Sequence, residues 1–255
     1  MALNLFDLTG KTALVTGSSR GLGRAFAEGF AGAGAQVVLN GANEERLSIA
    51  VDEMRARGAE VTGAAFDVTD EAAVKAAFET FDTEGTTIDI LVNNAGIQIR
   101  NPILEMETSD WQRVIDVNLT AAFVVGREAA RRMVPRGRGK IINIGSIMSG
   151  FARPTIAPYS AAKGGIKMLT QTMAAEWGPA GLQANAIGPG YMETDMNEAL
   201  IANEDFNSWV KGRTPARRWG KPEELVGTAI YLASDASNYV SGQLIYVDGG
   251  MTSVL

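Results

Sequence analysis

The feature that most constrains the fold is a regular alternation of short apolar stretches and longer helical patterns along the whole chain. Apolar runs of about four to eight residues are typical of buried strands, and helical segments between them indicate right-handed crossovers. The pattern therefore predicts an α/β domain with a doubly wound, seven-stranded parallel sheet that is flanked by helices. The expected strands lie at Thr12–Thr16, Gln36–Leu39, Glu60–Phe66, Ile88–Asn93, Lys140–Ile144, Gln183–Ile187 and Gln243–Val247.

Capping residues set the expected helix boundaries. Asn43 is a preferred N-cap residue, and we expect it to start a helix over Glu44–Arg57. A long helix is expected at Ser109–Met133 and another at Pro158–Trp177. Residues 191–218 depart from the alternation and are interpreted as a small helical lid over the site. The sequence contains no linker and no short-period repeat, so we expect one domain over residues 1–255.

Composition excludes several classes of function. The 255 residues include no cysteine and no histidine, which excludes disulfides, thiolate catalysis and histidine triads. No metal site is expected, because the usual nitrogen and sulfur ligands are absent. The formal charge of −6 offers no basic surface for nucleic acid. We expect no signal peptide, no membrane span and a cytoplasmic location.

A glycine-rich turn follows the first expected strand and leads into a helical pattern. Its glycines are Gly17, Gly21 and Gly23, with the spacing GxxxGxG rather than the commoner GxGxxG. Such a turn allows main-chain N–H groups to approach a pyrophosphate at the helix N-terminus. An ordinary turn is the alternative interpretation, but its place between a strand and a helix favours nucleotide binding.

A candidate acid/base pair lies on the expected helix at 158–177. Tyr159 and Lys163 are four residues apart, so they share one helix face. A free phenol has a pKa of about 10, and a neighbouring ammonium is expected to lower the pKa of Tyr159 toward neutrality. Ser146 follows a buried strand, and its hydroxyl is placed to donate to a substrate oxygen. A surface Tyr–Lys pair and a turn serine are the alternative interpretations.

Five residues strengthen the functional interpretation because each comes directly after an expected strand. Parallel strands present their carboxyl ends at one edge of the sheet, where α/β proteins bind their ligands. We therefore expect these residues to lie close together along that edge. They are Gly17, Asp67, Asn93, Ser146 and Pro189.

These motifs together resemble the short-chain dehydrogenase/reductase family over essentially the whole chain. The residues that carry the resemblance are Thr16-Gly17 with Gly21 and Gly23, Asn93 to Gly96, Asn118, Ser146, Tyr159, Lys163 and Pro189-Gly190. The resemblance implies a Rossmann-type domain and a catalytic tetrad. Tyr159 would be the general acid/base, Lys163 would lower its pKa and bind the nicotinamide ribose, and Ser146 would polarise the substrate oxygen. Asn118 would hold a water through its main chain.

The resemblance also implies a nicotinamide cofactor. The residues expected to bind it are Gly17, Ser19, Arg20, Gly21, Leu22, Gly23, Asn40, Asp67, Val68, Asn94, Ala95, Gly96, Tyr159, Lys163, Pro189, Gly190 and Thr194. The segment 40–42 carries no carboxylate to bind ribose hydroxyls, and Arg20 is placed to pair with a 2′-phosphate. NADP is therefore expected, with NAD as the alternative. The departure is Ala42, where many NADP-using relatives have an arginine.

Within the family, the chain looks most like gluconate 5-dehydrogenases. The stretches that carry this likeness are 5–8, 38–41, 95–98, 135–141, 152–154, 156–159, 213–216 and 218–220. The implied reaction interconverts D-gluconate and 5-dehydro-D-gluconate. A sugar acid needs a cation for its carboxylate, and Arg100 and Arg153 with Gln98 are the expected suppliers, beside Ser146 and Tyr159.

Other functions stay open at the level of the sequence. A 3-oxoacyl-carrier-protein reductase would need a basic docking patch, which Arg127, Arg131, Arg132, Arg136 and Arg138 offer. A polyol or keto-sugar reductase would share the same chemistry. A dinucleotide sensor is the non-enzyme alternative, although it has no need of the tetrad. The resemblance also implies a homotetramer, for which Phe123, Val124 and Val125 suggest an exposed apolar face; a place in the core of the domain is the alternative interpretation of these residues.

Overall fold

The computed structural model describes residues 2–254 and contains one parallel sheet in the order β3-β2-β1-β4-β5-β6-β7. The strands are β1 (Thr12–Val15), β2 (Gln36–Gly41), β3 (Val61–Ala65), β4 (Ile90–Asn93), β5 (Gly139–Ile144), β6 (Leu182–Pro189) and β7 (Leu244–Val247). The order reverses between β1 and β4, which are paired neighbours. The predicted doubly wound parallel sheet is therefore confirmed.

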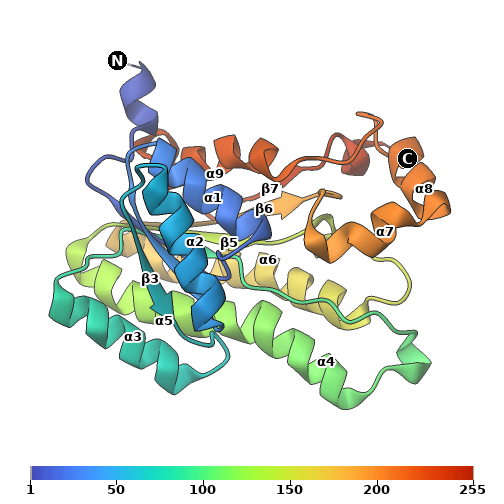
Figure 1. Ribbon diagram of the computed structural model, residues 1–255, viewed down its shortest axis with the longest axis horizontal. Helices are drawn as coiled ribbons and strands as arrows, with labels where there is room; N and C mark the ends of the chain where they lie inside the picture. Colours follow the sequence, from blue (N-terminus) through green and yellow to red (C-terminus); the bar gives the residue numbers. More distant parts are fainter. Residues whose placement is uncertain (1, 255) are drawn as a thin grey trace.

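Helices cover both faces of the sheet (Figure 1). They are α1 (Gly21–Gly32), α2 (Glu44–Ala56), α3 (Glu71–Glu84), α4 (Thr108–Ile115), α5 (Ala121–Met133), α6 (Ala157–Trp177), α7 (Glu198–Ala202), α8 (Glu204–Arg213) and α9 (Val226–Ala233). One core lies between the sheet and α1, α2 and α9, and it contains Phe26 and Phe30. The other lies beneath α3, α5 and α6, and it contains Phe78 and Met133.

The observed element boundaries confirm one prediction from the sequence and correct two others. Asn43 caps α2 by accepting from Arg46 N at 2.7 Å, as expected. The helix expected at Ser109–Met133 is interrupted by a π-turn at Asp116–Thr120, which separates α4 from α5. The fourth strand begins at Ile90 rather than Ile88.

Residues 191–218 hold α7 and α8, which lie beyond the ends of the strands in Figure 1. A β-bridge between Met192 and Gly220 closes the neck of this segment. Its inner side packs through a small apolar cluster that includes Val210 and Trp219. We refer to residues 191–218 as the lid segment.

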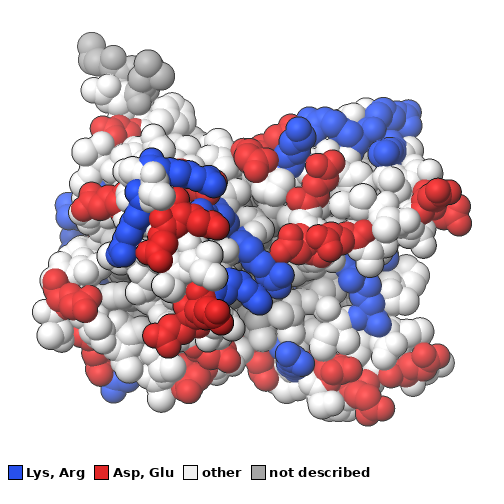
Figure 2. Space-filling model, viewed as in Figure 1, with Lys and Arg blue, Asp and Glu red and all other residues white. Residues whose placement is uncertain are grey.

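The charges on the surface, the exposure of three apolar residues and the hydropathy of the helices test further expectations from the sequence. Figure 2 shows acidic and basic side chains interspersed over the visible face of the molecule. Val124 and Val125 are buried in the core, so the expectation that they lie on an exposed apolar face is wrong; only Phe123 is exposed, at 44%. Across residues 2–254, no helix is both long and apolar enough to cross a membrane.

Candidate active site

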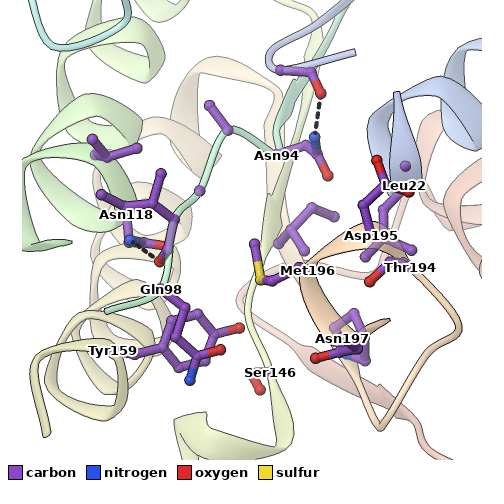
Figure 3. A pocket seen from close by; sticks show the side chains of 18 of the residues that line it. Leu22, Asn94, Gln98, Asn118, Ser146, Tyr159, Thr194, Asp195, Met196 and Asn197 are labelled. Carbon is purple, nitrogen blue, oxygen red and sulfur yellow. Dashed lines mark hydrogen bonds between the residues drawn. The ribbon is translucent and has the colours of Figure 1, made fainter. Parts of the chain in front are cut away.

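One large cleft of about 840 Å³ opens at the carboxyl ends of the strands. Such a volume suits a bound cofactor and substrate together. Figure 3 shows Asn118, Gln98 and Tyr159 on one side of the cleft and Leu22, Thr194 and Asp195 on the other. The structure brings every predicted site residue except Gly23 to this cleft: Gly17, Ser19, Arg20, Gly21, Leu22, Asn40, Asp67, Val68, Asn94, Ala95, Gly96, Gln98, Arg100, Asn118, Ser146, Arg153, Tyr159, Lys163, Pro189, Gly190 and Thr194.

The glycine-rich turn between β1 and α1 requires its glycines. Gly17 and Gly21 have φ values of +60° and +58°, which disfavour residues with a Cβ. Gly23 stands behind the cleft, where an added Cβ would lie 2.5 Å from Gly17 O. No side chain caps the N-terminus of α1, so its first N–H groups are available to an anion.

The side chains of two asparagines hydrogen-bond to the main chain of the glycine-rich turn. Asn94 Nδ2 donates to Thr16 O at 2.9 Å and to Gly17 O at 3.1 Å. Asn40 is buried, and its amide donates to Ala64 O and Phe66 O while Oδ1 accepts from Gly17 N. The Asn40 side chain thus bonds to the main chain and positions the turn.

Asn118 lies in the π-turn, where the regular ladder of helical hydrogen bonds is interrupted. Such turns occur frequently at functional sites. Its Nδ2 donates to Ile97 O and Val114 O, both at 2.9 Å. Its Oδ1 is buried without a hydrogen-bond partner in residues 2–254. A Cβ at Gly96 would lie only 2.8 Å from this oxygen, so glycine is required there.

Tyr159 and Lys163 share one face of α6, as the spacing predicted. Lys163 is buried, and its Nζ donates to Ile144 O at 2.6 Å. The same nitrogen lies 5.5 Å from the centre of the Tyr159 ring. Ser146 is also buried, and its Oγ accepts from Met148 N at 3.1 Å. This bond fixes the Ser146 hydroxyl at the end of β5.

Burial controls the protonation of this pair. Burial raises the pKa of Tyr159 above its ordinary value, and the Ser146 hydroxyl and the Arg100 charge only partly oppose it. Burial also lowers the pKa of Lys163 to about 8. The lowered pKa that we expected for Tyr159 is therefore not met in this structure, because desolvation exceeds the effects of the Ser146 hydroxyl and the Arg100 charge. At neutral pH the phenol is protonated and can donate a proton.

Two arginines come together beside Tyr159, although they belong to separate loops. Asn101 N donates to Thr155 O at 2.9 Å, and this main-chain bond joins the loop of Arg100 to the loop of Arg153. Arg100 also donates to Gln98 Oε1 at 3.1 Å. Burial and the charge of Arg153 both lower the pKa of Arg100. Neither arginine has an ion-pair partner in residues 2–254, so the pair presents uncompensated positive charge.

Comparison with known proteins identifies the family. The sequence model of a family described as enoyl-(acyl carrier protein) reductase matches residues 17–252. Gluconate 5-dehydrogenase of Gluconobacter oxydans is 51% identical over 98% of this chain and 97% of its own. The chain belongs to the short-chain dehydrogenase/reductase family. Like other members, this dehydrogenase is an oxidoreductase that acts on CH–OH groups.

Two more relatives bear on this short-chain dehydrogenase. A 2-dehydro-3-deoxy-D-gluconate 5-dehydrogenase of Formosa agariphila is 45% identical over 100% of this chain and 97% of its own. The crystal structure of a gluconate 5-dehydrogenase from Burkholderia cenocepacia, in complex with NADP and tartrate, is 49% identical. It superposes with a TM-score of 0.98 and covers 100% of both chains.

The cleft of the dehydrogenase fits a nicotinamide dinucleotide. Positions 17 and 21 of the turn carry no side chain, and no side chain caps the N-terminus of α1, so its main-chain N–H groups are available to a pyrophosphate. The side chains of Ser146, Tyr159 and Lys163 lie further along the same cleft, where a nicotinamide would meet a substrate. The residues present therefore suit this cofactor.

Sequence reasoning missed two site residues of the dehydrogenase. Arg46, in the first turn of α2, lines the cleft near Ala42 and has no ion-pair partner in the described chain. Tyr191, directly after Pro189-Gly190, lines the cleft near Tyr159. The signal for Arg46 was its place four residues after Ala42; Tyr191 had no signal beyond its neighbouring turn.

The arginines of the basic cluster that suggested a carrier-protein partner are all paired with acidic side chains. Each of its arginines lies within 4.0 Å of an acidic side chain, the distance of an ion pair. The pairs are Arg127–Glu71, Arg131–Glu128, Arg132–Asp82, Arg136–Asp89 and Arg138–Asp89. Arg136 and Arg138 share Asp89, so these five arginines have four carboxylate partners and the cluster retains little net positive charge. It would attract an acidic partner weakly and does not support a docking patch.

Proposed function

We propose that this protein is a gluconate 5-dehydrogenase that interconverts D-gluconate and 5-dehydro-D-gluconate with NADP. The observation that carries the proposal is the pair Arg100 and Arg153, which has no acidic partner in residues 2–254 and lies beside Tyr159. Two guanidinium groups next to an acid/base suit a substrate with a carboxylate at one end and a reacting hydroxyl at the other. Gln98, bonded to Arg100, supplies polar atoms for the remaining hydroxyls.

The proposed chemistry uses the tetrad. The cofactor, when bound, would accept the hydride from C5 as NADP⁺ in oxidation and supply it as NADPH in reduction. In reduction, the Tyr159 phenol gives its proton to the carbonyl oxygen at C5; in oxidation, the phenolate takes the proton from the hydroxyl. Ser146 donates to that same oxygen. Lys163, anchored on Ile144 O, binds the nicotinamide ribose, and the main chain at Asn118 holds a water between Lys163 and solvent.

The relatives support the acid substrate. The Burkholderia cenocepacia enzyme was solved with NADP and with tartrate, a hydroxylated dicarboxylate. Tartrate resembles one end of a sugar acid, with carboxylate and hydroxyl groups on adjacent carbons. A complex of a 49% identical relative with this acid is consistent with carboxylate recognition here.

The preference for NADP rests on the adenosine end of the cleft. The segment Asn40-Gly41-Ala42 carries no carboxylate that would repel a 2′-phosphate. Arg20 and Arg46 both line this part of the cleft. Arg20 pairs with Asp195 at 3.2 Å, but both side chains are more than half exposed, so this pair exchanges easily for a phosphate. Arg46 takes the place of the arginine that is absent at position 42.

A second candidate substrate shares the same site. The Formosa agariphila relative acts, by its name, at C5 of 2-dehydro-3-deoxy-D-gluconate. That compound has the same carboxylate and the same reacting carbon as gluconate, so Arg100, Arg153 and Tyr159 would serve either. The pocket around C2 and C3 would then decide between them.

Initial rates with purified protein test the proposal. Gluconate, 2-dehydro-3-deoxy-D-gluconate and neutral polyols are each supplied with NADP and with NAD, and the reverse reaction is run with 5-dehydro-D-gluconate. We expect the highest kcat/KM for gluconate with NADP. Higher efficiency with the deoxy acid would favour the second candidate, and efficiency only with neutral polyols would refute an acid substrate.

Assembly and location remain predictions. The exposed apolar side chains Trp111, Phe123 and Met168 on α4, α5 and α6 support a homotetramer that buries them. Sedimentation of the purified protein would measure its oligomeric state. The cytoplasmic location expected from the sequence is likewise a proposal.

A further inference from the structure

Tyr191 places a buried hydroxyl beside the two unpaired arginines. It lines the cleft, and its hydroxyl oxygen is buried without a hydrogen-bond partner in residues 2–254. The charges of Arg153 and Arg100 both act on this phenol, and the phenol in turn influences Tyr159. Tyr191, Arg100, Arg153 and Tyr159 all line the same cleft, and Tyr191 and Arg153 both contact the Phe206 ring. A buried hydroxyl without a partner is costly unless a ligand supplies one.

The Tyr191 ring is held by aromatic side chains of α8 and by Trp219, which directly follows the lid segment. Phe206, Trp209 and Trp219 each meet it edge to face, with centroid distances of 5.5, 5.9 and 5.4 Å. Offset and edge-to-face contacts of this kind are the favoured geometries for aromatic pairs. Tyr191 therefore cannot change its direction without disturbing α8.

Phe206 also supports Arg153. The guanidinium carbon of Arg153 lies 5.1 Å from the centre of the Phe206 ring, within the range of a cation–π contact. One side chain of α8 thus contacts both Tyr191 and Arg153. A displacement of α8 would therefore change the positions of both Tyr191 and Arg153.

The Tyr191 phenol acts as a donor. Burial raises its pKa, and the two arginine charges only partly oppose this, so the group is protonated near neutral pH. A protonated phenol can donate a hydrogen bond to a carboxylate oxygen. The three groups provide O–H and N–H donors within one cleft, which matches the needs of an anionic oxygen pair.

We propose that Tyr191 is a specificity-determining residue that donates a hydrogen bond to the substrate's carboxylate, in one subsite with Arg100 and Arg153. Phe206 of the lid segment holds Tyr191 and Arg153 in place, so recognition of the acid group depends on the packing of α8. The inference rests on the proposed function, because it assigns the group that reads the acid end of the sugar acid.

The decisive variant is Tyr191→Phe, which removes only the hydroxyl. We expect the KM for gluconate and the dissociation constant of tartrate from the NADP-loaded protein to rise about tenfold to hundredfold, as for a lost hydrogen bond to a charged group. The kcat should fall by less, and the NADP dissociation constant should not change. Tyr246→Phe removes a hydroxyl that does not line the cleft and serves as the matched control. Unchanged gluconate KM and tartrate affinity in Tyr191→Phe would overturn the proposal.

Two further measurements separate the possible causes. Inhibition by neutral D-sorbitol should be equal in wild type and Tyr191→Phe; an equal loss for sorbitol and tartrate would contradict carboxylate recognition. Phe206→Leu should weaken tartrate binding although every polar group remains; unchanged binding would refute the role of α8. If wild type does not oxidise gluconate with NADP, the proposed function fails, and tartrate calorimetry on wild type and Tyr191→Phe still decides the role of Tyr191.

Discussion

Lys163 lies one helical turn beyond Tyr159, yet its ammonium donates to the carbonyl oxygen of Ile144 at 2.6 Å and not to the phenol. The lysine is therefore a fixed, buried charge at the end of β5, positioned by the strand rather than by its helical neighbour. Its Nζ lies 5.5 Å from the centre of the Tyr159 ring. Burial of both groups raises the pKa of the phenol and lowers the pKa of the ammonium.

Replacing Tyr159 by phenylalanine should separate catalysis from binding. The change removes the acid/base group and leaves the ring packing intact. We expect kcat to fall by about 10²- to 10⁴-fold, as for loss of a general acid/base. NADP affinity, measured by fluorescence titration, should be retained. Retained turnover in this variant would show that another group transfers the proton.

The two directions of the reaction should respond differently to pH. Oxidation needs the phenolate of Tyr159, and its pKa is raised by burial. The rate of oxidation should therefore increase as the pH rises from 7 to 9, while reduction, which needs the phenol, should change little over that range. Initial rates in both directions at constant ionic strength measure this. An oxidation rate that is already maximal at pH 7 would contradict the raised pKa.

Arg20 and Arg46 should each favour NADP over NAD. Alanine at either position removes a cation from the adenosine end of the cleft, and we expect the ratio of kcat/KM for NADP to that for NAD to fall about tenfold. Calorimetry with adenosine 2′,5′-bisphosphate gives a readout that is independent of turnover. Arg57→Ala, at the far end of α2 and paired with Glu28, is the control. An unchanged ratio in both variants would remove these arginines from cofactor selection.

Arg153→Met should weaken the binding of acid substrates. The methionine keeps an unbranched apolar chain over Phe206 but loses the charge. We expect the KM for gluconate to rise about tenfold or more, with a smaller change in kcat. Arg217→Met, at an arginine of the lid segment that does not line the cleft, is the comparison. A KM equal to that of wild type would place the carboxylate elsewhere.

Lys140, which does not line the cleft, should make the free energy of unfolding depend on pH. It is buried at the start of β5, where Nζ donates to Ser237 Oγ and Asn238 Oδ1, and burial lowers its pKa to about 8. The unfolded chain binds more protons than the native state between that pKa and the ordinary value. The free energy of unfolding should therefore gain about 2 kcal/mol from this group between pH 7 and 9.5.

Urea unfolding at several pH values measures the Lys140 contribution. In Lys140→Met the rise in unfolding free energy between pH 7 and 9.5 should be smaller than in wild type, although the variant is less stable overall because Ser237 and Asn238 lose their partner. Part of the rise should remain, since the pKa of Lys163 is also about 8. Lys75→Met replaces an exposed lysine and should leave the slope unchanged. Equal slopes in wild type and Lys140→Met would contradict the lowered pKa.

The sequence by itself determined the sheet and the edge at which the site lies. Alternating strands and helices permit few topologies, and parallel strands all end at one edge. That logic correctly predicted that Gly17, Ser146 and Pro189 would meet in one cleft. The start of α2 at the Asn43 cap was also predicted correctly, because a helix cap depends on neighbouring residues alone.

Only the tertiary structure decided the electrostatics and the substrate end of the site. The Asn101–Thr155 bond joins two loops that are distant in sequence and so brings Arg100 and Arg153 together. The ion pairs of the arginine cluster and the aromatic contacts of Tyr191 likewise join separate segments. Burial, which sets the pKa of Tyr159, is a property of the packed molecule. Motif spacing along the chain does not contain these contacts, because they arise only when the elements pack against one another.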